Sequence, residues 1–424
     1  MKHTMRLVAI LIFGVAAACK PALAPSSEEA APPSGEKPPV AAMSRSTFAD
    51  DVAFLKSHGP IRILTAPSGA QVAVSATYQG RVMTSAVDAD GASLGWINRP
   101  FITGGKTGTA FDNYGGEDRF WLGPEGGQYG LYFPPGKPFD FAQWRTPAAF
   151  QEGAWQESSP SSDQAVFTRT MEVTNYSGGR FALDVERRVR LLSDADVAKH
   201  LGIDLPAAKE GGAKWVAFET VNRITNCGAE AWTRERGLPS IWILAMYAPS
   251  PDAHVLVPFE RSGTGPIVND AYFGKVPPDR LAVREGHLVF KCDGVFRSKI
   301  GLRPSRARDV LGSYSASARL LTLVHYDKPA GASDYVNSMW EVQKEPYGGD
   351  VVNSYNDGSP GPGLPPLGGF YELETSSPAA ALGPGQSLVH THRTFHFVGE
   401  RPALDPIAAR VLGVSATRIA EGVR

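Results

Sequence analysis

The sequence lacks several features that would assign it directly to a class of proteins. It contains three cysteines in 424 residues, carries a formal net charge of −1 and shows no cluster of basic residues. A near-zero charge without a basic patch argues against nucleic-acid binding, so we expect no nucleic-acid partner. It has no Walker phosphate loop, no dinucleotide fingerprint after a strand and no Gly-x-Ser-x-Gly nucleophile turn. These absences argue against the commonest nucleotide-dependent enzymes and serine hydrolases.

Long apolar runs are also missing, and the one near the N-terminus is short. Leu7–Ala18 has no charged residue, but a bilayer-spanning helix needs about 20 apolar residues. The run suits the core of a signal peptide, and the small residues before Cys19 are similar to a bacterial lipobox. We therefore expect residues 1–19 to be a lipoprotein signal peptide, with Cys19 lipidated. The alternative is an ordinary signal peptide cleaved after Ala24, although Pro25 disfavours that cut.

Residues 20–45 consist mainly of Pro, Ala, Ser, Glu and Lys. Such a segment buries too little apolar surface to offset its chain entropy, which predicts a flexible linker. Together with the lipobox, this predicts a lipid-anchored protein of the bacterial cell envelope, at the outer membrane and facing the periplasm. Membrane contact is then expected through the lipid anchor only.

Two cysteines remain after Cys19, namely Cys227 and Cys292. In an oxidising compartment they can form one disulfide, which in the chain-entropy model would stabilise the fold by ~4 kcal/mol. Two buried free thiols are the alternative. A zinc site is disfavoured because neither cysteine has a close Cys or His partner in the sequence.

Most of residues 46–424 read as strands and turns, and we treat them as one large domain. Apolar residues alternate with polar ones, as at Phe181, Leu183 and Val185, and Gly and Pro separate such runs. Many strands joined by turns predict a mainly β protein built as a large antiparallel sandwich. Short helices are expected at three places, namely residues 46–59, 193–202 and 405–413.

The segment from Gly115 to Gln128 is the densest in groups that can bind a ligand. Its glycines allow tight turns, and charged residues lie beside a tryptophan. An aromatic plate flanked by carboxylates and an arginine suits a sugar, whose apolar face stacks while its hydroxyls find polar partners. The alternative is a structural turn in which the arginine pairs with a carboxylate. The candidate substrate-binding residues here are Glu117, Arg119, Trp121 and Glu125.

A second candidate segment begins at Trp340 and mixes amide, aromatic and charged side chains. Glu341, Lys344 and Asn353 are its candidate substrate-binding residues. Asn356-Asp357-Gly358 is also a strong turn signal, so a plain loop is the alternative.

The final two strands form a third candidate region. Glu372 and Glu374 share one face of the first, and His390, His392 and His396 share one face of the second. Histidines beside carboxylates can bind a metal, but they are more often hydrogen-bonded members of a polar sheet face. We expect no cofactor and no tightly bound metal.

The residues around Glu374 resemble the closing stretch of galactose mutarotases. Gly369–Thr375 matches that family's Leu-Glu-Thr strand, and Leu382–Gln386 matches the turn after it. The chain is still more similar to a family of uncharacterised bacterial lipoproteins in the same superfamily. The resemblance implies a β-supersandwich with few short helices. It also implies that Glu374 is the catalytic base or, failing that, the principal anchor for a sugar hydroxyl.

The general-acid histidine of those epimerases has no counterpart near Trp242. We therefore expect His390 or His392 to reach the face of Glu374 and to donate the proton. The alternative to a catalytic Glu374 is that this residue merely caps a loop or pairs with Arg393.

The sequence thus predicts an exported lipoprotein that binds a carbohydrate and carries out acid–base chemistry on it. That chemistry would be of the epimerase (isomerase), lyase or hydrolase type. A non-catalytic carbohydrate-binding module and a structural envelope lipoprotein are the alternatives, and enzymatic activity is left open.

Overall fold

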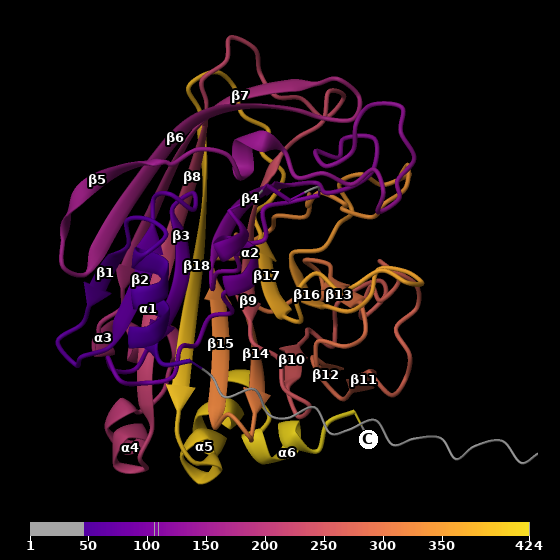
Figure 1. The fold of residues 1–424 in the computed structure, drawn as a ribbon. Helices are drawn as coiled ribbons and strands as arrows, with labels where there is room; N and C mark the ends of the chain where they lie inside the picture. The colour runs from indigo at the N-terminus through magenta and orange to yellow at the C-terminus, as the bar shows by residue number, and fades with distance from the viewer. Residues whose placement is uncertain (1–45, 106, 109, 424) are drawn as a thin grey trace, which may run out of the picture. The chain divides into compact units, whose positions relative to one another are not determined.

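The framework of the chain is a set of three antiparallel sheets. The computed structural model describes residues 46–105, 107–108 and 110–423, and these form one compact unit. The largest sheet has ten strands in the order β11-β12-β10-β14-β15-β18-β8-β7-β6-β5, and Figure 1 shows its long strands β6, β7, β8 and β18. Its strands are β5 (Gln156–Ser161), β6 (Gln164–Thr174), β7 (Arg180–Leu191), β8 (Lys214–Asn226), β10 (His254–Pro258), β11 (Leu281–Arg284), β12 (His287–Lys291), β14 (Val310–Ser315), β15 (Leu320–Tyr326) and β18 (Ser387–Val398).

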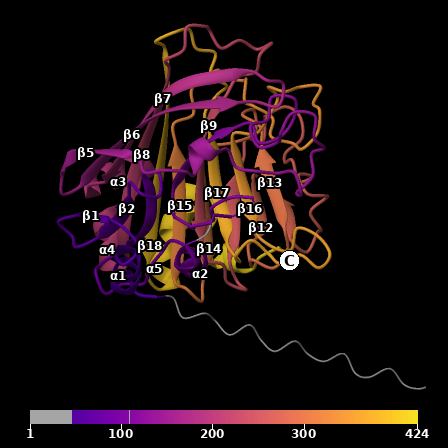
Figure 2. The same cartoon turned by 45° about the horizontal axis from the view of Figure 1, so that its top comes forward.

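The second sheet has five strands in the order β13-β16-β17-β9-β4, and β13, β16, β17 and β9 can be followed side by side in Figure 2. Its strands are β4 (Arg119–Gly123), β9 (Ser240–Tyr247), β13 (Ser298–Leu302), β16 (Val352–Asn356) and β17 (Tyr371–Ser376). The smallest sheet is formed by β1 (Arg62–Thr65), β2 (Gln71–Ser75) and β3 (Arg81–Ala86).

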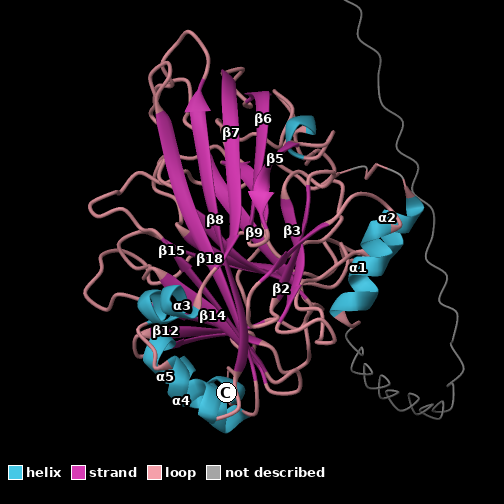
Figure 3. Ribbon diagram, turned by 90° about the vertical axis from the view of Figure 1, so that its left-hand side faces the viewer, coloured by secondary structure: helices cyan, strands magenta, loops and turns pink. Residues whose placement is uncertain are grey.

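Helices are short and lie outside the sheets. Figure 3 shows α3, α4 and α5 at one end of the long strands, whereas α1 and α2 lie on the side of β2 and β3. The helices are α1 (Phe48–Lys56), α2 (Arg99–Gly104), α3 (Asp194–Leu201), α4 (Leu205–Glu210), α5 (Arg401–Leu412) and α6 (Ala416–Ala420), with a 3₁₀ turn at Ala148–Phe150. None of the helices in the described residues is long and apolar enough to cross a membrane.

The prediction of a mainly β fold with few short helices is confirmed. Strand β7 alternates as its sequence predicts, with Phe181, Leu183 and Val185 buried and their neighbours more exposed. The buried faces of the ten-stranded and five-stranded sheets pack against each other, as in the contact cluster that holds Phe218 and Ile243. Burying one face of each sheet removes apolar surface from water and leaves the other face free for function.

Two of the three predicted helices begin close to the expected positions, α1 at Phe48 and α3 at Asp194. The Thr47 hydroxyl accepts a hydrogen bond from the Asp50 backbone N–H at 3.1 Å, and Ser193 forms a capping box with Asp196. The start of the third was predicted wrongly. Helix α5 begins four residues earlier, with Pro402 in its first turn and Pro406 inside it. A proline suits the first turn because its missing N–H would be unpaired there in any case.

The signal peptide, the lipidated Cys19 and the linker predicted for residues 20–45 lie outside the described residues. They remain predictions.

Candidate functional site

The five-stranded sheet has one face in the core and one face that gathers charged and aromatic side chains. Residues opposite each other in an antiparallel pair share a face. Glu374 is opposite Leu244 of β9 and Asn353 of β16, and Leu244 is in turn opposite Arg119 of β4. Trp121 is likewise opposite Trp242 on the same two strands. Four strands therefore bring residues far apart in sequence onto one face.

This face forms the floor of a pocket with an empty volume of about 470 Å³, including the part that is open to solvent. Loops on both sides of β4, between β10 and β11, before β13, and on both sides of β16 complete its walls. Most of the lining residues are aromatic, and five are charged. The lining residues are Phe111, Arg119, Trp121, Glu125, Phe141, Trp144, Trp242, Leu244, Phe273, Arg297, Lys299, Trp340, Tyr355, Leu367, Phe370 and Glu372.

Aromatic rings pack edge to face or tilted along the pocket wall. The ring centroids of Trp121 and Trp242 are 5.8 Å apart, and those of Trp121 and Trp144 are 6.3 Å apart. Phe273 and Trp340 meet edge to face at 5.3 Å. An apolar wall with a few fixed polar groups is typical of small-molecule sites.

Two buried ion pairs lie on the floor of the pocket. The Lys299 ammonium donates to Glu374 Oε2 at 2.8 Å, and Trp242 Nε1 donates to the same oxygen at 2.9 Å. Arg119 Nη2 donates to Glu372 Oε1 at 2.5 Å. All four charged side chains are at most 6% exposed. Burial of charges is costly unless they are paired. These two pairs are therefore buried parts of the site and not exposed surface salt bridges.

Burial also shifts the pKa values of the charged residues in the pocket. It raises the pKa of Glu372 to about 8, with Arg119 opposing the shift and Glu374 reinforcing it. Burial raises the pKa of Glu125 as well, while Lys299 acts to lower it. For Lys299 itself burial acts to lower the pKa, but Glu374 and Glu125 outweigh it and the pKa is raised. The pocket thus contains a carboxyl group that can hold a proton near neutral pH beside a charged ammonium.

Some buried polar atoms of the site have no hydrogen-bond partner within the described residues. On Arg119 these are Nε and Nη1, and on Arg297 it is Nε. The indole N–H groups of Trp121 and Trp144 are in the same position, as is Oε1 of Glu374. Buried polar groups are nearly always paired, so a cluster of unpaired ones in a pocket points to a ligand.

The structure brings together four of the predicted site residues. Arg119, Trp121 and Glu125 line the pocket, and Glu374 lies beneath it, fully buried and bonded to two lining residues. Asn353 shares the sheet face but bonds Tyr272 and the Ile300 carbonyl instead of lining the pocket.

Three other predicted residues lie elsewhere. Glu117 faces the inside of the molecule, where its carboxylate accepts from Ser85 and contacts His396 at 2.9 Å. Glu341 and Lys344 are exposed. Their neighbour Trp340 reaches the pocket in their place, because side chains of an irregular loop follow no simple alternation.

The expectation that His390 or His392 reaches the face of Glu374 is wrong. Strands β17 and β18 do not pair with each other but belong to different sheets. His390 Nε2 and His392 Nδ1 both bond the Thr375 hydroxyl, at 2.8 and 2.9 Å. Thr375 and Glu374 are successive strand residues, so their side chains point to opposite faces. Burial also lowers the pKa of both histidines to about 3, so neither ring is positively charged at neutral pH.

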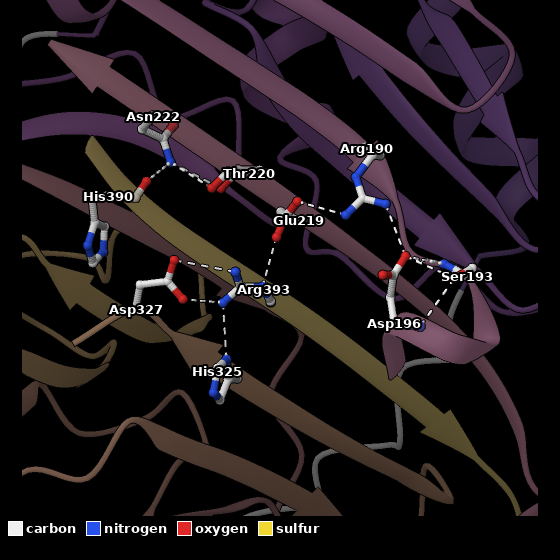
Figure 4. A network of polar contacts seen from close by, with 10 residues as sticks. All are labelled: Arg190, Ser193, Asp196, Glu219, Thr220, Asn222, His325, Asp327, His390 and Arg393. Atoms are coloured by element: carbon white, nitrogen blue, oxygen red, sulfur yellow. Dashed lines mark hydrogen bonds and ion pairs between the residues drawn. The ribbon is translucent and has the colours of Figure 1, made fainter. Parts of the chain in front are cut away.

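Arg393, considered above as a partner of Glu374, belongs to a different network on the outer face of the ten-stranded sheet (Figure 4). There it donates to Glu219 and Asp327. Among the described residues, no group of three or more His, Cys, Asp or Glu side chains is arranged to hold a metal ion.

The disulfide considered for the two remaining cysteines is not formed. Cys227 and Cys292 are both free thiols, the first exposed and the second buried. The alternative of two buried thiols therefore holds for Cys292 alone.

Sequence reasoning missed several lining residues, above all Lys299 and Arg297. Lys299 is the one charged residue of β13, whose other members are apolar or small. A single lysine in a strand that is buried throughout indicates a buried ion pair, because an unpaired buried ammonium is costly.

The model of a family of unknown function, DUF6786, matches residues 46–423. The chain belongs to this family. No curated protein sequence matches it.

Several solved structures are similar to this chain at low sequence identity. An Escherichia coli K12 protein named as a candidate aldose 1-epimerase is 12% identical, with a TM-score of 0.48, over 80% of this chain and 98% of its own. A galactose mutarotase-like protein from Lactobacillus casei is 12% identical, with a TM-score of 0.43, over 80% of this chain and all of its own. A galactose mutarotase related enzyme from Lactobacillus acidophilus is 8% identical, with a TM-score of 0.43, over 80% of this chain and 98% of its own.

These structures are of the mutarotase class that the sequence of this chain resembles. The similarity concerns the fold alone, and the residue roles below rest on the geometry of this chain.

Proposed function

We propose that this chain binds a carbohydrate in the aromatic pocket and carries out acid–base chemistry on it. One observation carries the proposal: a single sheet face sets two buried ion pairs, Lys299–Glu374 and Arg119–Glu372, beside walls of tryptophan. Indole faces stack on the C–H faces of a sugar ring, and fixed charges bind its hydroxyl groups.

The two carboxyl groups of β17 support acid–base chemistry because their surroundings differ. Glu372 lines the pocket with its pKa raised by burial to about 8, which suits a general acid that is protonated before reaction. Glu374 accepts hydrogen bonds from Lys299 and Trp242 and keeps Oε1 free, which suits a general base. Different environments for two neighbouring carboxyl groups are the usual way to obtain an acid and a base in one site. An epimerase, a lyase and a hydrolase all need such a pair.

A non-catalytic carbohydrate-binding module is the second candidate, and one observation favours it. Glu374 is 0% exposed and is covered by Lys299 and Trp242, so it does not touch the space of the pocket. In a binding module this carboxylate would only hold the lysine and the indole in place.

The full chain should first be tested on a glycan array, and the sugars that bind should then be followed by NMR for a change in anomer, linkage or configuration. Glu374→Gln keeps the shape of the side chain and removes the base, so we expect activity to fall by about a hundredfold or more. Glu219→Gln is the matched control, because Glu219 is a comparably buried glutamate in the outer network. Binding without turnover would select the binding module. Binding to no glycan at all would overturn the proposal.

We further propose that the protein is held in the bacterial envelope by a lipid on Cys19, at the outer membrane and facing the periplasm. The support is the sequence pattern before Cys19 and the linker composition of residues 20–45. Metabolic labelling with a radioactive fatty acid should mark the wild-type chain and spare Cys19→Ser. Equal labelling of both would contradict the anchor.

A further inference from the structure

The unpaired polar atoms of the pocket are unevenly divided between donors and acceptors. Arg119, Arg297, Trp121 and Trp144 all line the pocket and together contribute five buried N–H nitrogen atoms without a partner in the described part of the chain. Oε1 of Glu374 is the one such acceptor that belongs to this site, and it lies below the lining residues. A hydroxyl group both donates and accepts, whereas a carboxylate only accepts. The buried unpaired atoms of the pocket therefore call for hydrogen-bond acceptors on the ligand.

The charges are unevenly paired as well. Arg119 and Lys299 each pair with a glutamate, whereas Arg297 forms no ion pair within the described residues and interacts with Glu125 of the pocket only at longer range. The Arg297 guanidinium instead lies 3.6 Å from the ring centroid of Phe273 and 5.4 Å from that of Trp340. Aromatic rings on its sides fix its direction and displace water, but they do not neutralise its charge.

We propose that the ligand is an acidic sugar whose carboxylate pairs with Arg297, with Arg119 and the indole N–H groups donating to other sugar oxygens. This inference rests on the proposed function and names the class of its substrate. A planar guanidinium binds a carboxylate through two parallel hydrogen bonds, which gives both strength and orientation. A doubly charged phosphate fits less well, because it brings two negative charges to a site where Arg297 is the lining cation without an ion pair in the described residues.

The test is calorimetric titration of the full chain with matched sugars. Glucuronate and galacturonate are compared with glucose and galactose, with the two hexose 6-phosphates, and with short oligomers of the first four. We expect the uronates to bind about tenfold or more tightly than the neutral hexoses, as for a charge-assisted interaction in a partly buried site. Arg297→Gln should abolish this preference, and Arg297→Lys should keep part of it. Arg401→Gln, at an exposed arginine on α5, is the control and should change nothing.

Each outcome decides one of the two proposals. Tighter binding of neutral sugars, or a uronate preference that survives in Arg297→Gln with an unchanged unfolding midpoint, overturns the acidic-sugar assignment and leaves carbohydrate binding intact. Tighter binding of the phosphates overturns the choice of carboxylate. Failure of every sugar and oligomer to bind overturns the proposed function itself.

Discussion

Two arginines, Arg119 and Arg393, are both buried on a sheet face and both pair with a glutamate, yet their surroundings differ. Arg393 uses its nitrogens fully: Nε donates to Glu219 at 2.8 Å, and Nη1 donates to Asp327 at 2.6 Å (Figure 4). Arg119 pairs with Glu372 through Nη2 alone and leaves its other two nitrogens without partners. Complete pairing is what a structural network needs, whereas incomplete pairing in a pocket leaves room for a ligand.

The outer network also extends to the start of α3, as Figure 4 shows. Arg190 bridges Glu219 on β8 and Asp196 on α3, at 3.0 Å to each. Ser193 caps the helix through the same Asp196. This network therefore joins two strands to a helix, and nothing in it requires a further partner.

The largest effect is expected from breaking the pocket pair Lys299–Glu374. Lys299→Met leaves the buried Glu374 without its cation, which should lower the free energy of unfolding by about 3–5 kcal/mol. Urea unfolding followed by far-ultraviolet circular dichroism measures this loss. Adding Glu374→Gln to the same chain removes the stranded charge and should recover most of it. A double variant as unstable as the single one would show that the pair is not what stabilises this face.

A second prediction concerns pH and separates the two networks. Burial raises the folded-state pKa of Glu372 from 4.5 to about 8, so the folded chain holds this proton more tightly than the unfolded chain. Its contribution to stability is then fully present below about pH 4.5 and is lost as the pH rises through about 8. We expect a shallower fall of the unfolding free energy over this range in Glu372→Gln than in the wild type. Glu219→Gln should keep the wild-type slope, and equal slopes in all three chains would contradict the shift.

The smallest effect is expected in the outer network. Arg190 is about a third exposed, at 34%, so its ion pairs are screened by water. Arg190→Ala should cost about 1 kcal/mol of unfolding free energy or less and should leave sugar binding unchanged. A loss comparable to that of Lys299→Met, measured in the same urea titrations, would remove the distinction between the two networks.

The fold was predictable because alternation reports which face of a strand is buried. The strand from Arg180 to Leu191 follows this pattern along its whole length, and the helix caps at Thr47 and Ser193 follow local chemistry. Helix α5 was misplaced because Pro402 and Pro406 carry the same local signal, and only packing decides between them.

The site was only partly predictable, since its residues meet through strand order. Alternation correctly put Glu372 and Glu374 on one face, but it could not show that β17 and β18 lie in different sheets. Consecutive strands pair often enough that the histidines were expected beside Glu374. Lys299 lies on a short strand and Arg297 in the loop before it. Their positions in the pocket are set by strand pairing between segments that are distant in the sequence.

The central claim, that the incompletely paired pocket and not the outer network is the ligand site, is tested most directly by tryptophan fluorescence. Trp340 lines the pocket and Trp215 bonds Asp194 on the side of α3, and both are half-buried. Titration of the full chain with the sugars found on the array should give a saturable change in the wild type and in Trp215→Ala. In Trp340→Ala we expect the affinity to fall by about tenfold or more, as for loss of a stacking aromatic in a pocket. An affinity that survives in Trp340→Ala and falls in Trp215→Ala would contradict the claim.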